Sequence, residues 1–156
     1  GVVDRIIAGR ITLAAGGREL VATMRAHGAW TALVSGGFTV FTSRIAAMLG
    51  FDENRANTLG QKDGFLEGTV AEPILGREAK LATLRELRQR AGLATTDTMA
   101  VGDGANDLAM IREAGVGVAF HAKPAVAAEA AVRIEHGDLT ALLYVQGYRR
   151  DEFVTV

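Results

Sequence analysis

The stretch TMAVGDGANDLAMI, from Thr98 to Ile111, places two acids, an Asn and two glycines directly after a short apolar run. The apolar residues 99–101 predict a buried strand, so Asp103 would stand at the end of that strand. The glycines permit a sharp turn, and Asn106 and Asp107 are of residue types that often begin helices. The stretch therefore predicts a strand, a turn and a helix, with charge at the carboxyl end of the strand.

Short apolar strands alternate with amphipathic helices on both sides of this stretch. The spacing of apolar residues predicts helices over 19–26, 38–49, 77–91, 107–114 and 139–145. Apolar runs predict a strand that ends at Ser35, one within 55–60, and three over 98–101, 116–120 and 130–135. Residues 61–70 predict a hairpin with turns at Asp63-Gly64 and Glu67-Gly68. This alternation predicts an α/β fold with a mostly parallel sheet covered by helices on both faces.

Two of these helices have one-sided apolar patterns, which indicate the faces that should be buried. The face of the first comprises Phe38, Phe41, Ile45, Met48 and Leu49, and that of the second Leu81, Leu84 and Leu87.

Length and composition exclude several classes of protein. A chain of 156 residues predicts one domain over residues 1–156, and a net charge of −1 provides no basic surface for nucleic acid or an anionic membrane. No apolar run is long enough to span a bilayer. The absence of cysteine excludes disulfides and Cys-zinc sites and fits a reducing compartment, so we expect a cytoplasmic location.

Three stretches should follow strands and meet at the carboxyl-end rim of the sheet, where ligands bind in such folds: Ser35-Gly36-Gly37, residues 102–107 and residues 121–123. Residues 102–107 do not fit a dinucleotide fingerprint, because Asp107 stands where a small residue is needed, and they fit neither a calcium-binding EF-hand loop nor a P-loop. Two interpretations remain about equally supported. The acids and the Asn form a helix cap, or they form a Mg²⁺ site.

The other rim stretches also allow two interpretations each. Ser35 is either the N-cap of the next helix or, with backbone N–H groups, part of a phosphate-binding turn. Lys80, in the first turn of a helix, and Lys123 are competing cations for a phosphate, and the position of Lys80 alone is that of an ordinary surface lysine. His121 is a base or a structural side chain.

Four segments together resemble the phosphoserine phosphatases of the haloacid dehalogenase-like (HAD) superfamily over essentially the whole chain: LVSGGFTVF, REAKLATLRELRQRAGL, VGDGANDLAMIREAGVGVAF and HAKP…HGDLTALL. The resemblance implies a Rossmann-like three-layer α/β/α fold with a small β-hairpin insertion. It also implies Mg²⁺-dependent hydrolysis of O-phospho-L-serine to L-serine and phosphate, a step of serine biosynthesis.

The resemblance implies roles for six residues. Ser35 and the backbone N–H of Gly36 would bind the substrate phosphate, and Asn106 would contact the phosphoryl group. Lys80 would neutralise the charge of the phosphate and of the nucleophile, so the resemblance prefers it to Lys123. Asp103 would be a direct Mg²⁺ ligand, and Asp107 would support the metal and the lysine. A divalent cation and a phosphate ester would then meet between the serine turn and the acidic turn.

The superfamily reaction also needs an Asp nucleophile and a second Asp two residues later, in an Asp-x-Asp-x-Thr/Val motif. No Asp of the chain begins such a motif. Residues 1–14 resemble the end of the family's cap domain or a linker, so we expect the nucleophile and most of the cap to lie upstream. We therefore predict that these 156 residues do not turn over substrate alone.

In the family, the strand that carries the nucleophile lies between the strands that end at Ser35 and at Gly102. We expect the unpaired edges to be filled by the apolar N-terminus, by a second copy of the chain or by an upstream fragment. Two other functions stay open: a phosphatase of the same superfamily acting on another small metabolite, and a non-catalytic module that binds Mg²⁺ and phosphate.

Overall fold

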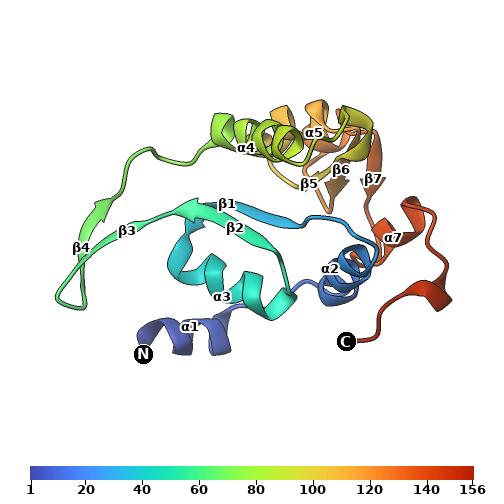
Figure 1. The fold of residues 1–156 in the computed structure, drawn as a ribbon. Coiled ribbons are helices and arrows are strands. Elements are labelled where there is room, and N and C mark those ends of the chain that lie inside the picture. Colours follow the sequence, from blue (N-terminus) through green and yellow to red (C-terminus); the bar gives the residue numbers. More distant parts are fainter. The chain divides into compact units, whose positions relative to one another are not determined.

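The computed structural model describes residues 1–156 and contains two compact units, residues 1–74 with 138–156 and residues 75–137 (Figure 1). Both units are built from helices and strands in alternation, which confirms the predicted α/β class. The single domain expected over the whole chain stays a prediction. None of the helices combines the length and the apolar character that a membrane span requires.

The first unit contains two small sheets and their helices. Its elements are α1 (Val2–Arg10), α2 (Gly17–Ala26), β1 (Ala32–Phe38), α3 (Thr39–Leu49), β2 (Glu53–Asn57), β3 (Leu59–Lys62), β4 (Phe65–Val70), α7 (Ala141–Val145) and the short 3₁₀ helix η3 (Arg150–Glu152). Strands β1 and β2 pair in parallel, and α3, which connects them, packs against both. Helix α1 lies against α3, where Asp4 forms an ion pair with Arg44.

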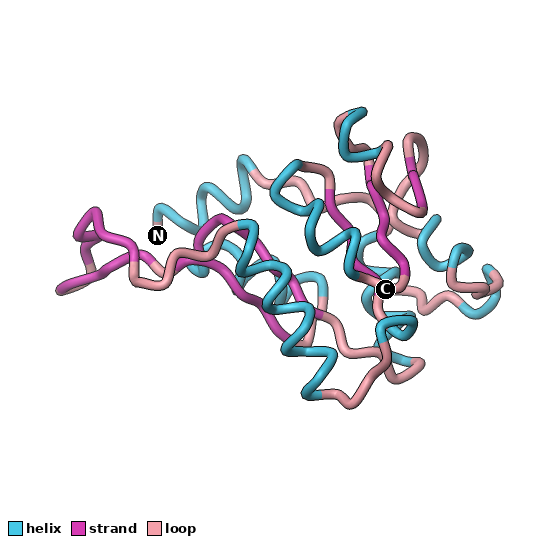
Figure 2. Tube along the Cα trace, turned by 90° about the horizontal axis from the view of Figure 1, so that it is seen from above, coloured by secondary structure: helices cyan, strands magenta, loops and turns pink.

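Strands β3 and β4 form the predicted hairpin, whose turn end projects beyond β1 and β2 (Figures 1 and 2). The turn is at Asp63-Gly64, and both residues have positive φ angles, 51° and 82°. Such angles match the right-handed twist of a hairpin and favour Asp-Gly pairs. The second turn predicted at Glu67-Gly68 is wrong, because these residues lie within β4.

The predicted inward face of α3 is partly wrong. The buried residues are Thr42 and Ala46, whereas Met48 is 43% exposed. The hydroxyl of Thr42 donates to Oδ1 of Asn54 on β2, at 3.0 Å. The polar Thr42 therefore faces the strands because it has a hydrogen-bond partner there, which apolar periodicity does not reveal.

The second unit contains a three-stranded parallel sheet in the order β5-β6-β7. Its elements are α4 (Arg77–Arg90), η1 (Thr95–Asp97), β5 (Met99–Gly102), η2 (Ala105–Asp107), α5 (Leu108–Glu113), β6 (Val116–Phe120), α6 (Pro124–Ala127) and β7 (Val132–Ile134). Its core is formed by Ile111, Ala119, Val126 and Ala130. Helices α5 and α6 thereby pack their apolar residues on β6, and the polar loops are left at the strand ends.

Candidate active site

The acidic turn follows β5 as predicted, and the carboxylate of Asp107 organises it. Strand β5 ends at Gly102, so Asp103 stands at the carboxyl end of the strand. Oδ2 of Asp107 accepts hydrogen bonds from the backbone N–H groups of Asp103, at 3.1 Å, and Gly104, at 3.2 Å. The side chain therefore folds back over its own turn. It accepts the N–H of Gly104, the N-cap of the 3₁₀ helix η2, and makes no capping hydrogen bond to α5, which begins at Leu108.

Lys80 reaches the same carboxylate from α4. Its Nζ donates to Oδ1 of Asp107 at 2.6 Å, and the two side chains are only 9% and 6% exposed. The interpretation of Lys80 as an ordinary surface lysine is therefore wrong. Buried charges are retained only where they are paired and hydrogen-bonded, and here each oxygen of Asp107 has at least one donor.

Gly102 is needed because of a close approach between backbone and side chain. A Cβ atom at this position would lie 2.4 Å from Cβ of Asp107 and 2.5 Å from its Cγ. Any larger residue would push the carboxylate away from Lys80. The glycine that the sequence pattern assigns to a sharp turn thus also makes room for Asp107.

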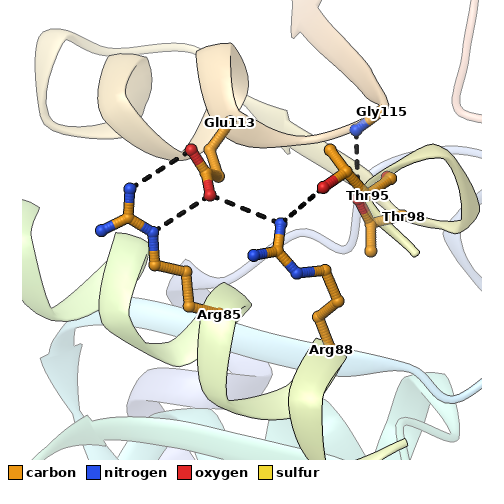
Figure 3. Close-up of polar contacts among 6 residues, drawn as sticks. All are labelled: Arg85, Arg88, Thr95, Thr98, Glu113 and Gly115. Carbon is orange, nitrogen blue, oxygen red and sulfur yellow. Dashed lines mark hydrogen bonds and ion pairs between the residues drawn. The ribbon is translucent and has the colours of Figure 1, made fainter. Parts of the chain in front are cut away.

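An ion-pair network holds α4 against α5 (Figure 3). The carboxylate of Glu113 accepts two hydrogen bonds from Arg85, at 3.0 and 3.3 Å, and one from Arg88, at 3.4 Å. Arg88 also donates to Oγ1 of Thr95, at 2.9 Å. The hydrogen bond from Arg85, with the charges of both arginines, lowers the pKa of Glu113. Because the network joins α4 to α5 and η1, it keeps the helix that carries Lys80 next to the acidic turn.

The side chains of Asp103 and Asn106 take no part in this buried pair. Both residues are exposed, and neither side chain makes a hydrogen bond or ion pair with the rest of the chain. Both side chains are therefore free to bind a ligand at the carboxyl end of β5, the position that the sequence pattern predicted for them.

The third rim stretch, residues 121–123, lies beside the acidic turn. The backbone N–H of Lys123 donates to the carbonyl of Asp103 at 3.3 Å, while the Lys123 side chain is exposed and has no ion pair. The His121 ring stacks on Phe120, with 4.1 Å between centroids, and its Nε2 lies 2.9 Å from the carbonyl oxygen of Gly137. These contacts favour the structural interpretation of His121.

The donors of this turn fit a magnesium ion with a single direct carboxylate. Asp103 is free, whereas both oxygens of Asp107 are occupied by protein donors. The chain contains no group of three or more His, Cys, Asp or Glu residues that could hold a metal. Mg²⁺ usually retains several waters and binds through one or two carboxylates and a phosphate, so one free carboxylate at this position is compatible with it. Asp107 then acts as a support for the turn.

The serine turn lies in the first unit and differs from its prediction. Strand β1 does not end at Ser35 but runs to Phe38, with an irregular register between Val34 and Phe38. Oγ of Ser35 accepts a hydrogen bond from the N–H of Gly37 at 3.0 Å, and the N-cap of α3 is Phe38. The N-cap interpretation of Ser35 is therefore wrong. That Ser35 meets Lys80 and Asp103, which belong to the second unit, stays a prediction.

Comparisons with known proteins identify the family to which these parallel strands and the acidic turn after β5 belong. The family model described as haloacid dehalogenase-like hydrolase matches residues 2–112. The chain belongs to the haloacid dehalogenase-like hydrolase family.

Within this family the chain is similar to phosphoserine phosphatases. The chain is 42% identical to the phosphoserine phosphatase of Streptomyces coelicolor over 97% of this chain and 37% of that protein. It is 45% identical to the phosphoserine phosphatase of Albidiferax ferrireducens over 90% of this chain and 61% of the relative. It therefore spans less than two thirds of the length of either curated relative.

A solved structure supports the same likeness. A phospho-aspartyl intermediate analogue of phosphoserine phosphatase is 37% identical to this chain and superposes with a TM-score of 0.81, over 92% of this chain and 69% of that one. The HAD-like fold class expected from the sequence is thereby confirmed.

Proposed function

We propose that the chain provides the phosphate- and metal-binding part of a Mg²⁺-dependent phosphomonoesterase that hydrolyses O-phospho-L-serine, a step of serine biosynthesis. The observation that carries this proposal is the buried Lys80, held by Asp107, whose carboxylate also binds the backbone N–H of Asp103. The likeness to phosphoserine phosphatases over 97% of the chain supports the choice of substrate.

Each residue of the acidic turn has a defined task in this proposal. Asp103 would bind Mg²⁺ directly, and the ion would neutralise charge on the phosphate. Asp107 would fix the turn through two backbone N–H groups and would hold the Lys80 side chain in place through their ion pair. Phosphoryl transfer depends mainly on positioning and on charge neutralisation, which these groups supply.

Asn106 and the serine turn complete the proposed phosphate site. The free amide of Asn106 can donate to a phosphoryl oxygen. Ser35 and the backbone N–H of Gly36 would donate to the other oxygens. The proposal therefore requires both units to bind the same phosphate group.

The nucleophile of the proposed reaction is an Asp that forms an aspartyl-phosphate, as the solved phospho-aspartyl analogue of a relative suggests. Residues 1–156 contain no Asp-x-Asp motif. We therefore expect no turnover of O-phospho-L-serine by these residues alone, and a nucleophilic Asp would have to be supplied from outside them.

The test is an assay of the natural gene product against a panel of small phosphate monoesters with Mg²⁺. We expect the highest kcat/KM for O-phospho-L-serine, loss of activity in Asp103→Asn and retained activity in the matched control Lys123→Met. A higher kcat/KM for another monoester would refute the substrate, in favour of a different small-metabolite phosphatase. Binding of Mg²⁺ and orthophosphate without any hydrolysis would instead indicate the non-catalytic module.

A second measurement separates the role of the chain from that of its nucleophile. The purified 156-residue chain should bind Mg²⁺ and orthophosphate and release no phosphate from O-phospho-L-serine. Steady hydrolysis by this chain, abolished in Asp103→Asn, would refute an external nucleophile.

A further inference from the structure

Strand β1 contains an unusual interruption around the serine turn. Against β2 it pairs Ala32 with Glu53 and Val34 with Arg55, but the next pair is Phe38 with Asn57. Between the last two pairs β1 therefore has more residues than β2, and Ser35-Gly36-Gly37 bulges out of the ladder. Bulges of this kind re-aim backbone and side-chain groups and are common next to functional sites.

The peptide group between Gly36 and Gly37 is held from both sides. Its carbonyl, that of Gly36, accepts a hydrogen bond from Nδ2 of Asn57 at 2.9 Å. Its N–H, that of Gly37, donates to Oγ of Ser35 at 3.0 Å. A trans peptide directs its C=O and N–H in opposite directions, so each bond enforces the orientation that the other needs.

The two glycines explain why such a restraint is necessary. A peptide flanked by glycines can rotate at little steric cost, because both residues reach φ and ψ values that other residues avoid. The Asn57 side chain is buried, with the residue 7% exposed, so its amide group is fixed by its surroundings. It lies at the end of β2, directly opposite the end of the bulge.

The orientation of this peptide decides what the Ser35 hydroxyl can do. Because Oγ accepts the Gly37 N–H, the hydroxyl hydrogen is left to donate to another group. A phosphate dianion offers only acceptor oxygens, so it requires a donor here. If the peptide turned over, the Gly36 carbonyl would take the place of the Gly37 N–H and would compete with phosphate for the hydroxyl hydrogen.

We propose that Asn57 is a positioning residue of the phosphate site: by holding the Gly36 carbonyl it keeps the Ser35 hydroxyl oriented as a donor. This inference rests on the proposed function, because it concerns the same phosphate. Asn57 itself does not touch the phosphate. No pattern in the sequence assigned it a role.

The test compares two isosteric substitutions on the same strand. Asn57→Asp keeps the side-chain shape but replaces the donor by an oxygen that repels the Gly36 carbonyl. Asn54→Asp is the matched control, because Asn54 uses its Oδ1 as an acceptor for Thr42, and an Asp retains that oxygen. Thermal unfolding of both variants shows whether they remain folded, and Asn57→Ser replaces Asn57→Asp if the latter does not.

Two readouts are measured on the ¹⁵N-labelled 156-residue chain. The first is hydrogen exchange of the Gly37 amide without ligand, and the second is the affinity for orthophosphate in the presence of Mg²⁺, followed at the Gly36 and Gly37 amide signals. In Asn57→Asp we expect faster Gly37 exchange and orthophosphate binding weakened about tenfold, the factor equivalent to one hydrogen bond of typical net strength. Asn54→Asp should change neither.

The outcomes separate this inference from the proposed function. If Ser35→Ala weakens orthophosphate binding and Asn57→Asp does not, the positioning role is overturned and the proposed function stands. Faster Gly37 exchange with unchanged phosphate affinity also overturns it, because Asn57 then serves the fold alone. If the unsubstituted chain binds no orthophosphate, the proposed function fails and the inference fails with it.

Discussion

Lys80 and Asp107 form a buried ion pair with 2.6 Å between Nζ and Oδ1, although 27 residues separate them in the sequence. The pair joins the first turn of α4 to the turn after β5. The pair thus contributes to the stability of the fold. In the proposed function it also holds the positively charged side chain of Lys80 at the phosphate site. These two contributions can be measured separately.

Removing the charge of Asp107 should destabilise the fold. Asp107→Asn leaves the Lys80 ammonium buried without a counter-ion, which costs about 3 kcal/mol of unfolding free energy. Urea denaturation measures the loss of unfolding free energy. The matched control is Asp103→Asn, which changes an exposed acid of the same turn and should alter the unfolding free energy by less than about 0.5 kcal/mol. The double variant Lys80→Met/Asp107→Asn should recover part of the loss. Equal stabilities of Asp107→Asn and the control would show that the ion pair contributes nothing.

Enlarging Gly102 should displace the same carboxylate. Gly102→Ala places a Cβ 2.4 Å from Cβ of Asp107, and overpacking of this kind costs about 1–3 kcal/mol. We also expect weaker Mg²⁺ binding by calorimetry, because Asp107 shapes the turn that carries Asp103. Gly9→Ala is the control, since a Cβ at Gly9 meets no atom within 4 Å. Unchanged stability and unchanged Mg²⁺ affinity in Gly102→Ala would contradict the packing argument.

The network around Glu113 should make stability depend on acid pH. The Arg85 hydrogen bond lowers the pKa of Glu113 in the folded chain, so folding favours the ionised form. This stabilisation is complete above the ordinary pKa of a glutamate and is lost as the pH falls through the lowered folded value.

We therefore expect the stability difference between the unsubstituted chain and Glu113→Gln to be constant near neutral pH and to shrink below the ordinary pKa of glutamate. Melting temperatures of both proteins, recorded from neutral pH to below the ordinary pKa of glutamate, measure this difference. Glu135→Gln is the control, because Glu135 makes no hydrogen bond or ion pair. A difference between the unsubstituted chain and Glu113→Gln that grows toward acid pH would have the wrong sign.

Paramagnetic Mn²⁺ in place of Mg²⁺ tests whether the two units share one phosphate. With orthophosphate present, Mn²⁺ bound at Asp103 should broaden the amide signals of Ser35 and Gly36 as well as those of the acidic turn. The broadening should disappear in Asp103→Asn. Broadening confined to the acidic turn would separate the serine turn from the metal site and would remove Ser35 from the proposed mechanism.

Local patterns in the sequence were sufficient for the elements near the acidic turn. The apolar run before Gly102 and the polar residues after it predicted a strand followed by a turn and a helix, and β5, η2 and α5 confirm this order. The Asp63-Gly64 pair likewise predicted a hairpin turn, because few residue pairs tolerate two positive φ angles. Both features depend on neighbouring residues alone.

Other features depended on partners distant in the sequence. The position of Lys80 in the first turn of a helix is also that of an ordinary surface lysine, and only its ion pair with Asp107 shows that the side chain is buried. Strand β1 was expected to end at Ser35, but it extends to Phe38 because it pairs again with Asn57 of β2 after the bulge. In each case the deciding contact joins different elements.

The amino-acid order by itself determined the α/β class, the position of the acidic turn and the identity of the candidate ligands, because strand, turn and helix preferences act over a few residues. Only the tertiary structure decided which of those side chains is free and which is engaged. Asp103 is left open to a ligand, whereas Asp107 is held by Lys80 and two backbone N–H groups. The two acids are alike in the sequence, and burial against a helix brought in from elsewhere in the chain makes them different.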